Sequence, residues 1–286
     1  MDKEIFNALF STHAVRVCDA EAPFWYTSGK IGPFYINTHF LFGSEKDAVS
    51  LLAAIEKAAE GDRLLFPKTI LSILLEQYHT NAIFRMITDK VTEKAKALDF
   101  DFISGGERRD FFFSILPAYF LEKPHLSIFK DESSVYSDAG FSKTVSSDSV
   151  ALQGQKSLHI VDLVTEASSY TRAWLPVIRK LGAKMEDTIT VIDRQQGGED
   201  VLKKEGVRLF SLFLIDSFLF DAAKDSKEID EKQYQLVKQF LNEPEGFMPA
   251  FIKSHPDFIE KQILLGGKAK ERALLAVEKG FAALPQ

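Results

Sequence analysis

The stretch LHIVDLVTEASSY, residues 158–170, decides the expected fold of this chain. It opens as an apolar strand that ends in an acid, Asp162, and a turn with small hydroxyl residues then leads into a helix over 170–181. In a parallel sheet, a helix start after a strand presents free N–H groups to a phosphate, and an acid there can accept hydrogen bonds from sugar hydroxyls. The alternative is structural: Ser168 or Ser169 only caps the helix, and Asp162 is a polar strand end.

Two other apolar strands are followed by turns that contain glycine and arginine. Residues 102–111 read FISGGERRDF, and residues 192–198 read IDRQQGG. Glycine allows a backbone to approach an anion closely, and the guanidinium groups of Arg108 and Arg109 suit phosphate recognition. Arg194 likewise directly follows an expected strand and is followed by two glycines, Gly197 and Gly198. The alternative for each stretch is a tight turn with surface charges.

Strands and helices alternate through most of the chain, and each strand is largely apolar. This pattern predicts an α/β fold with a mostly parallel sheet flanked by helices, and places Asp162, Gly105 and Arg194 at one edge of it. Residues 24–37 read as strand, turn and strand, and residues 131–149 as a long mobile loop. The other expected strands are 100–103, 126–129, 188–193 and 207–215, and the other expected helices include 5–10, 46–59, 68–98, 111–121, 257–265 and 268–284.

Composition excludes several classes of protein. The 286 residues are 45% hydrophobic and 27% charged, which suits one large globular domain or a domain with an appendage. A net charge of −6 lacks the basic footprint of a general nucleic-acid binder, and six scattered histidines with one cysteine predict no metal site built from the protein. The longest apolar stretch, residues 111–121, falls short of the roughly 20 residues that span a membrane, so we expect a cytoplasmic protein.

Taken in order, these segments resemble the orotate phosphoribosyltransferases of pyrimidine synthesis. The resemblance covers about residues 1–216, apart from 62–98. Residues 27–37, TSGKIGPFYIN, are like the hood element at the N-terminus of that family, and residues 100–106, FDFISGG, are like its pyrophosphate-binding loop. Residues 193–195, DRQ, match the family's Asp-Arg-Gln, whose arginine contacts the carboxylate of the base.

The chain also departs from the family pattern at several positions. After Lys130, residues 131–140 hold neither the lysine nor the histidine of the family's mobile catalytic loop. The other departures are Leu163 for the second acid of the phosphoribosyl pyrophosphate (PRPP) motif, Glu166 for a small hydroxyl residue, Ser168 for the loop glycine, Thr27 for the hood lysine and Arg109 for the lysine of the pyrophosphate loop.

The resemblance implies a type I phosphoribosyltransferase domain over residues 1–216, with a hood at about 1–45, a helical insertion at about 62–98 and a helical extension over 217–286. It implies transfer of a phosphoribosyl group from PRPP to orotate or a related pyrimidine base, with Mg²⁺ accompanying PRPP and a homodimer as the assembly. The departures keep an alternative open: a non-catalytic member of the fold that binds a nucleotide or PRPP in a regulatory role.

The residues that match the family's motifs divide into two implied roles, and none of them is a predicted metal ligand. The implied catalytic residues are Asp162, Lys130 and Arg109. The implied substrate-binding residues are Arg194, Phe34, Tyr35, Lys30, Gly105, Gly106, Arg108, Thr165, Glu166, Ala167, Ser168 and Ser169.

Overall fold

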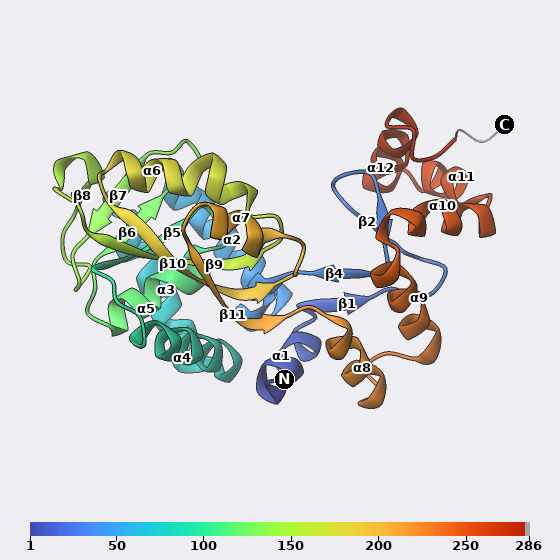
Figure 1. Cartoon of the computed structure of the whole chain (residues 1–286), viewed down its shortest axis with the longest axis horizontal. Helices are drawn as coiled ribbons and strands as arrows, with labels where there is room; N and C mark the ends of the chain where they lie inside the picture. The colour runs from blue at the N-terminus through green and yellow to red at the C-terminus, as the bar shows by residue number, and fades with distance from the viewer. Residues whose placement is uncertain (284–286) are drawn as a thin grey trace. The chain divides into compact units, whose positions relative to one another are not determined.

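The computed structural model describes residues 1–283, which divide into two compact units (Figure 1). The first, here called the sheet unit, comprises Met1–Ala14 and Asn37–Asp216. The second, here called the helical unit, comprises Val15–Ile36 and the chain from Ser217 onward. Within the described residues, no helix combines the length and apolarity needed to cross a membrane.

A seven-stranded sheet organises the sheet unit, in the order β11-β10-β9-β5-β6-β7-β8. The first five strands in this order pair in parallel, whereas β7 and β8 add to the edge in antiparallel pairing. The mostly parallel sheet predicted from the sequence is therefore confirmed. The strands are β5 (Phe102–Gly106), β6 (His125–Ile128), β7 (Ser134–Ser137), β8 (Thr144–Ser146), β9 (Lys156–Val164), β10 (Lys184–Asp193) and β11 (Arg208–Leu214).

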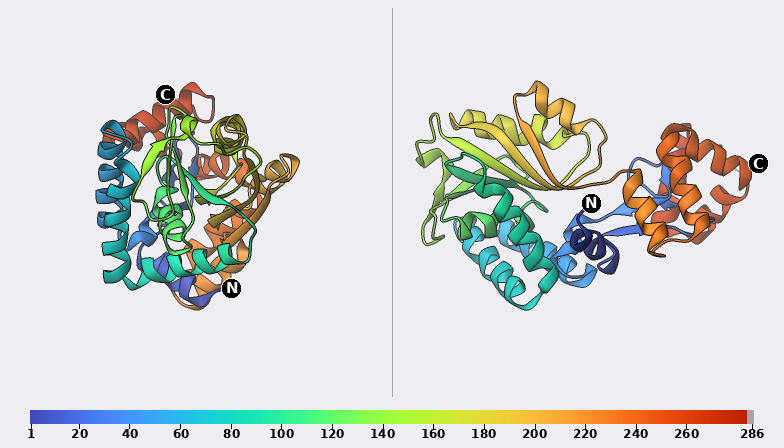
Figure 2. Two further views of the ribbon diagram at one scale, coloured as in Figure 1. Left: turned by 90° about the vertical axis from the view of Figure 1, so that its left-hand side faces the viewer. Right: turned by 60° about the horizontal axis from the view of Figure 1, so that its bottom comes forward.

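Helices cover both faces of this sheet (Figures 1 and 2). On one face lie α6 (Leu175–Lys180) and α7 (Gly198–Lys204). On the other lie α4 (Ala82–Lys96) and α5 (Phe111–Phe120), with α2 (Glu45–Glu60) and α3 (Phe66–Thr80) packed outside them. The core beneath α5 is aromatic: Phe66 packs against Phe111 and Phe129 with ring centroids 4.9 and 5.0 Å apart. The remaining elements of the unit are α1 (Lys3–Ser11), the 3₁₀ turns η1 (Thr38–Phe42) and η2 (Ser147–Ser149), and the π-helical turn η3 (Tyr170–Trp174).

Two sequence predictions for this unit were wrong. The single helix expected over 68–98 is two helices, α3 and α4, because the Asn81 side chain accepts hydrogen bonds from the N–H groups of Ile83 and Phe84 and so starts a new helix. The loop expected over 131–149 instead contains β7 and β8, which extend the sheet through regular antiparallel pairs. These strands carry serine and threonine side chains that hydrogen-bond to each other across the sheet, as Ser137 and Thr144 do at 3.0 Å, so the sequence shows no apolar alternation there.

The helical unit joins the short strands of residues 15–36 to the C-terminal helices. Trp25 stacks on Phe258 at 5.6 Å and donates its indole N–H to Gln262 at 2.8 Å. The strands are β1 (Val15–Val17), β2 (Phe24–Trp25), β3 (Ile31–Gly32) and β4 (Phe34–Ile36), paired β1 with β4 and β2 with β3, and the helices are α8 (Ser217–Asp225), α9 (Glu231–Asn242), α10 (Pro244–Ser254), α11 (Phe258–Leu265) and α12 (Gly267–Glu278). The helix expected over 268–284 ends at Glu278, and Leu284 lies outside the described residues.

We predict that the helical unit depends on the buried Phe34 side chain. Phe34 is 2% exposed and lies 4.9 Å from Phe220 and 5.5 Å from Phe240, between ring centroids. Phe34→Ala should lower the free energy of unfolding by about 3–5 kcal/mol, because a large cavity replaces the ring. Phe218→Ala is the matched control: this ring is 72% exposed, so its loss should change stability by no more than about 0.5 kcal/mol. Urea denaturation followed by circular dichroism measures both, and equal effects of the two substitutions would contradict the assignment of this core.

Candidate functional site

The chain reverses its direction across the sheet between β5 and β9. From β5 it proceeds through β6, β7 and β8 on one side, and from β9 through β10 and β11 on the other. The hydrogen-bonded ladder between β5 and β9 ends at the pair Ser104 and His159, although both strands continue beyond it. In open α/β sheets, ligands bind outside the carboxyl ends of the strands at such a reversal.

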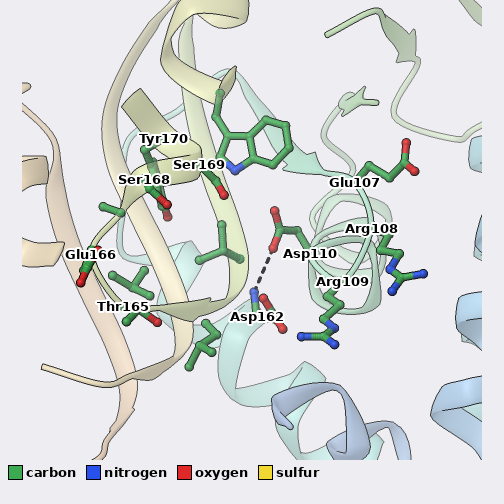
Figure 3. Close-up of a pocket in the computed structure, with 15 residues that line it drawn as sticks. Glu107, Arg108, Arg109, Asp110, Asp162, Thr165, Glu166, Ser168, Ser169 and Tyr170 are labelled. Carbon is green, nitrogen blue, oxygen red and sulfur yellow. Dashed lines mark hydrogen bonds between the residues drawn. The ribbon is translucent and has the colours of Figure 1, made fainter. Parts of the chain in front are cut away.

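A cavity of about 340 Å³ lies at this position (Figure 3). Two connections line it: the turn between β5 and α5, and the segment from the end of β9 into η3. In the view of Figure 3, Thr165 and Glu166 lie on one side and the Arg108 side chain on the other. The full lining is Glu107, Arg108, Arg109, Asp110, Val161, Asp162, Leu163, Val164, Thr165, Glu166, Ala167, Ser168, Ser169, Tyr170 and Trp174.

The turn after β9 leads directly into helical structure. The carbonyl of Ala167 accepts hydrogen bonds from the N–H groups of Tyr170 at 3.1 Å and Thr171 at 3.4 Å. Ala167 itself has φ +55°, the left-handed conformation that lets the chain reverse tightly here. The helix start places backbone N–H groups beside the cavity, where an anion can accept from them. Glu166 is exposed, and Ser168 and Ser169 contribute hydroxyl groups to the lining.

Of the two arginines on the opposite side, Arg109 is the cation available to the cavity. Arg108 forms an ion pair with Glu56 of α2. Arg109 is half-buried and makes no salt bridge with any residue in the described part of the chain. The neighbouring Glu107 carboxylate accepts a 2.9 Å hydrogen bond from the backbone N–H of Lys130, which ties this turn to the end of β6.

Two buried carboxyl groups, Asp110 and Asp162, meet between these sides. Asp110 is 7% exposed and Asp162 is 8% exposed. Asp110 accepts hydrogen bonds from the backbone N–H groups of Gly106 at 3.1 Å and of Asp162 at 3.2 Å, the second drawn in Figure 3. Burial, together with the Asp162 charge, raises the pKa of Asp110 well above its ordinary value. Burial raises the pKa of Asp162 to about 6, although the Arg109 charge opposes this shift.

Aromatic side chains close the cavity wall. The Trp174 ring lies so close to Gly106 that a Cβ atom on that glycine would meet the ring at 2.3 Å. The Tyr170 hydroxyl bonds to Thr188 at 2.6 Å, and burial raises the pKa of Tyr170 well above its usual value. Beyond the arginines, burial and the charges of Arg109 and Arg108 lower the pKa of His39 to about 3, so His39 stays neutral near pH 7.

The structure brings together eight of the residues singled out from the sequence, which line the cavity: Asp162, Arg108, Arg109, Thr165, Glu166, Ala167, Ser168 and Ser169. Four others lie at strand ends without lining it. Gly105 and Gly106 end β5, Lys130 follows β6, and Arg194 follows β10, where its backbone N–H donates to the Val164 carbonyl at 3.0 Å.

Three further predicted residues belong to the helical unit. Lys30 forms an ion pair with Glu245, Phe34 lies in the core of that unit, and Tyr35 packs near Phe24. Sequence reasoning missed the lining residues Asp110, Tyr170 and Trp174. An acid immediately before an apolar helix was the available signal for Asp110, but that pattern is also typical of an ordinary helix start.

Comparison with known proteins finds relatives in sequence and in structure. No model of a protein family matches the chain. Orotate phosphoribosyltransferase of Pyrococcus horikoshii is 30% identical over 146 residues, which are 50% of this chain and 74% of that protein. Uridine 5'-monophosphate synthase of Bos taurus is 32% identical over 104 residues, which are 36% of this chain and only 20% of the cattle protein. The structure of UMP synthase from Leishmania donovani superposes with a TM-score of 0.56 at 18% identity, covering 84% of this chain and 42% of that chain, which shows a shared fold.

We predict that Gly106 is required for the wall of this cavity. Gly106→Ala should lower the free energy of unfolding by about 1–3 kcal/mol, because the rigid Trp174 ring has to move to admit a methyl group. Gly140→Ala is the control, since a Cβ atom there meets nothing within 4 Å. Thermal denaturation compares the two variants with the parent protein. A Gly106 variant as stable as the Gly140 variant would show that Trp174 does not pack on this strand end.

Proposed function

The chain belongs to the orotate phosphoribosyltransferase family, and on this premise we propose that it transfers a phosphoribosyl group from PRPP to orotate or a related pyrimidine base. One observation carries the proposal. A cavity at the reversal of a parallel sheet combines a helix-opening turn, a buried acid on a strand end and a cation without a salt bridge to any described residue. These are the parts that a phosphate, a sugar diol and a diphosphate require.

Each part of the ligand has a proposed partner in the chain. The 5'-phosphate would accept hydrogen bonds from the backbone and hydroxyl groups of the turn Thr165–Ser169. Asp162 would accept hydrogen bonds from the sugar hydroxyls, and Arg109 would neutralise the diphosphate, with Arg108 and Lys130 nearby in the chain. The proposal assigns Arg194 to the carboxylate of the base. Base contacts of Lys30 and Tyr35 stay predictions from the family resemblance, whereas the Phe34 ring is buried in the core of the helical unit and is not assigned to the ligand.

The reaction itself exchanges one bond at the anomeric carbon of the sugar. The bond from that carbon to the diphosphate oxygen breaks, and its electron pair leaves with pyrophosphate. A ring nitrogen of the base forms the new bond and releases its proton to solvent. Positive charge develops on the sugar as the bond lengthens, and negative charge develops on the departing oxygen. Asp162 would stabilise the first and Arg109 the second, which is electrostatic catalysis by preorganised groups.

In this proposal Mg²⁺ binds to PRPP and not directly to protein side chains. Within residues 1–283, no cluster of three or more His, Cys, Asp or Glu side chains is placed to hold a metal ion. Mg²⁺ keeps several waters and commonly binds through phosphate oxygens, so it would arrive on the diphosphate instead of occupying a protein cage. A homodimer stays a prediction from the family resemblance, and a cytoplasmic location stays a prediction from the length of the apolar stretches.

A second function, ligand binding without turnover, is favoured by two specific observations. In the family the segment after β6 is a mobile catalytic loop, whereas here Ser134–Ser137 and Thr144–Ser146 form strands of the main sheet. Leu163 also lines the cavity where the family's motif has an acid. Such a protein would bind PRPP or a nucleotide and act through that binding.

We predict that PRPP binds and that the side chains of Asp162 and Arg109 control its turnover. Calorimetry with and without Mg²⁺ measures binding, and loss of orotate absorbance measures turnover. If the protein is an enzyme, Asp162→Asn and Arg109→Ala should each lower kcat/KM by about 10²–10³, because each removes a charge that acts in the transition state. Arg179→Ala is the control, because Arg179 pairs with Glu205 and lies outside the cavity lining.

The outcomes separate the two functions. Heat of binding with no orotate consumption supports the binding protein and excludes the transferase. Neither heat nor consumption at millimolar PRPP would reject both.

We also predict that Glu166 weakens phosphate binding. A carboxylate and a phosphate about 4 Å apart repel by roughly 1–4 kcal/mol, depending on the local dielectric. Glu166→Thr should therefore tighten binding of PRPP by about fivefold or more. Glu199→Thr removes an exposed acid outside the cavity lining and should change affinity by less than about twofold. Equal affinities of the Glu166 variant and the parent would show that this carboxylate points away from the bound phosphate.

A further inference from the structure

A gap opens in the centre of the sheet where the ladder between β5 and β9 ends, and one side chain spans it. Past Ser104 and His159 the two strands no longer pair, yet β5 continues to Gly106 and β9 continues past Asp162. The two oxygens of the Asp110 carboxyl group accept the N–H groups of Gly106 and Asp162, at 3.1 and 3.2 Å. Asp110 thus replaces the missing strand-to-strand bonds with a side-chain bridge.

The same bridge brings two buried carboxyl groups close together, because the Asp110 carboxyl group accepts its second hydrogen bond from the backbone N–H of Asp162 itself. Two carboxyl groups so placed can hydrogen-bond to each other only when one of them carries a proton, because a carboxylate has no donor. Burial of both side chains, at 7% and 8% exposure, disfavours a second negative charge. The bridge is therefore in its stable form when the pair holds one proton.

We propose that Asp110 is a positioning residue of this cavity, which holds the turns after β5 and β9 together and shares one proton with Asp162, so that affinity for an anionic ligand falls when the proton leaves. The ligand class rests on the proposed function, because the anion in question is the phosphate or diphosphate of PRPP. The proposal goes beyond that function by assigning pH control to a residue outside the family's motif.

The other charged groups around the pair determine the direction of the effect. Arg109 and Arg108 precede Asp110 in its own turn and stay cationic, and Glu107 precedes them. Tyr170, from η3, stays neutral because burial raises its pKa well above the ordinary value. Across the arginines His39, from η1, stays neutral because its pKa falls to about 3, and Glu166 lines the far side. Loss of the shared proton thus adds a negative charge to the cavity.

Carbon-13 NMR of protein labelled at the aspartate carboxyl carbons tests the shared proton directly. Resonances are assigned by their absence from the Asp110→Asn and Asp162→Asn variants. We expect the pair to titrate in two separate steps, with the upper step well above the ordinary range of an aspartate. Ionisation of both groups within the ordinary range of an aspartate, or a single step for the pair, would overturn the proposal.

Sulfate binding tests the consequence for anions, because sulfate remains a dianion throughout the titration. Calorimetry at constant ionic strength should show about tenfold weaker binding above the upper NMR midpoint than below it. Asp110→Asn keeps a side-chain acceptor and a donor but cannot ionise, so its affinity should change by less than about twofold across the same interval. Asp110→Ala removes the bridge and should lose sulfate binding at every pH. An Asn variant with the pH dependence of the parent, or a parent whose affinity is constant, would disprove the link.

A matched control separates this effect from the loss of any buried acid. Asp187 is 5% exposed, is bonded by Arg208 at 2.7 Å and lies outside the cavity lining, so Asp187→Asn should keep the pH dependence of the parent. Neither NMR nor sulfate binding requires PRPP. A protein that ignores PRPP but shows the paired titration would refute the proposed function alone, and a protein that binds PRPP without the titration would refute this inference alone.

Discussion

The two hydrogen bonds that the Asp110 carboxyl group accepts hold the site in place. The sheet provides a ladder between β5 and β9 only as far as Ser104 and His159, and the cavity exists because the strands do not pair beyond that point. An open strand end leaves backbone N–H groups that must find acceptors. Asp110 satisfies one on each strand, at Gly106 and Asp162. The separation of the two turns that line the cavity therefore depends on one side chain at the start of α5.

This bridge places two acids where the proposed ligand is anionic, and the surrounding charges have to compensate. Arg108 is engaged by Glu56, which leaves Arg109 as the cation facing the acids. The Arg109 charge opposes the rise in the pKa of Asp162 and so favours a carboxylate there, whereas Asp110 retains its proton more readily. When the two acids share a proton, the pair carries one negative charge opposite Arg109. Ionisation of both acids would add a second negative charge, which would repel an anionic ligand.

The sequence predicted the sheet because strand burial leaves an apolar signature that needs no tertiary information. Eight predicted residues line the cavity because the carboxyl ends of parallel strands meet at one edge of the sheet. Asp162 and Arg109 therefore come together from distant parts of the chain. The strands over 134–146 were missed because their hydroxyl side chains bond across the sheet and carry no apolar alternation. The association of Trp25 with Gln262 and of Phe34 with Phe220 depends on contacts across about 190 to 240 residues, which no local pattern encodes.

The departures from the family motif affect the parts of the proposed reaction unequally. A helix-opening turn binds phosphate through backbone N–H groups, and these remain whatever side chains stand at Glu166 and Ser168. Stabilising a sugar cation and a departing diphosphate instead requires charged side chains in fixed places, and each one lost costs about 3–4 kcal/mol of transition-state stabilisation. The replacement of an acid by Leu163 removes one such charge, and Asp110 returns a carboxyl group to the cavity from a different strand end with its proton still bound. Ligand binding in this fold therefore tolerates sequence drift that turnover does not, because one depends on the backbone and the other on the identity of a few side chains.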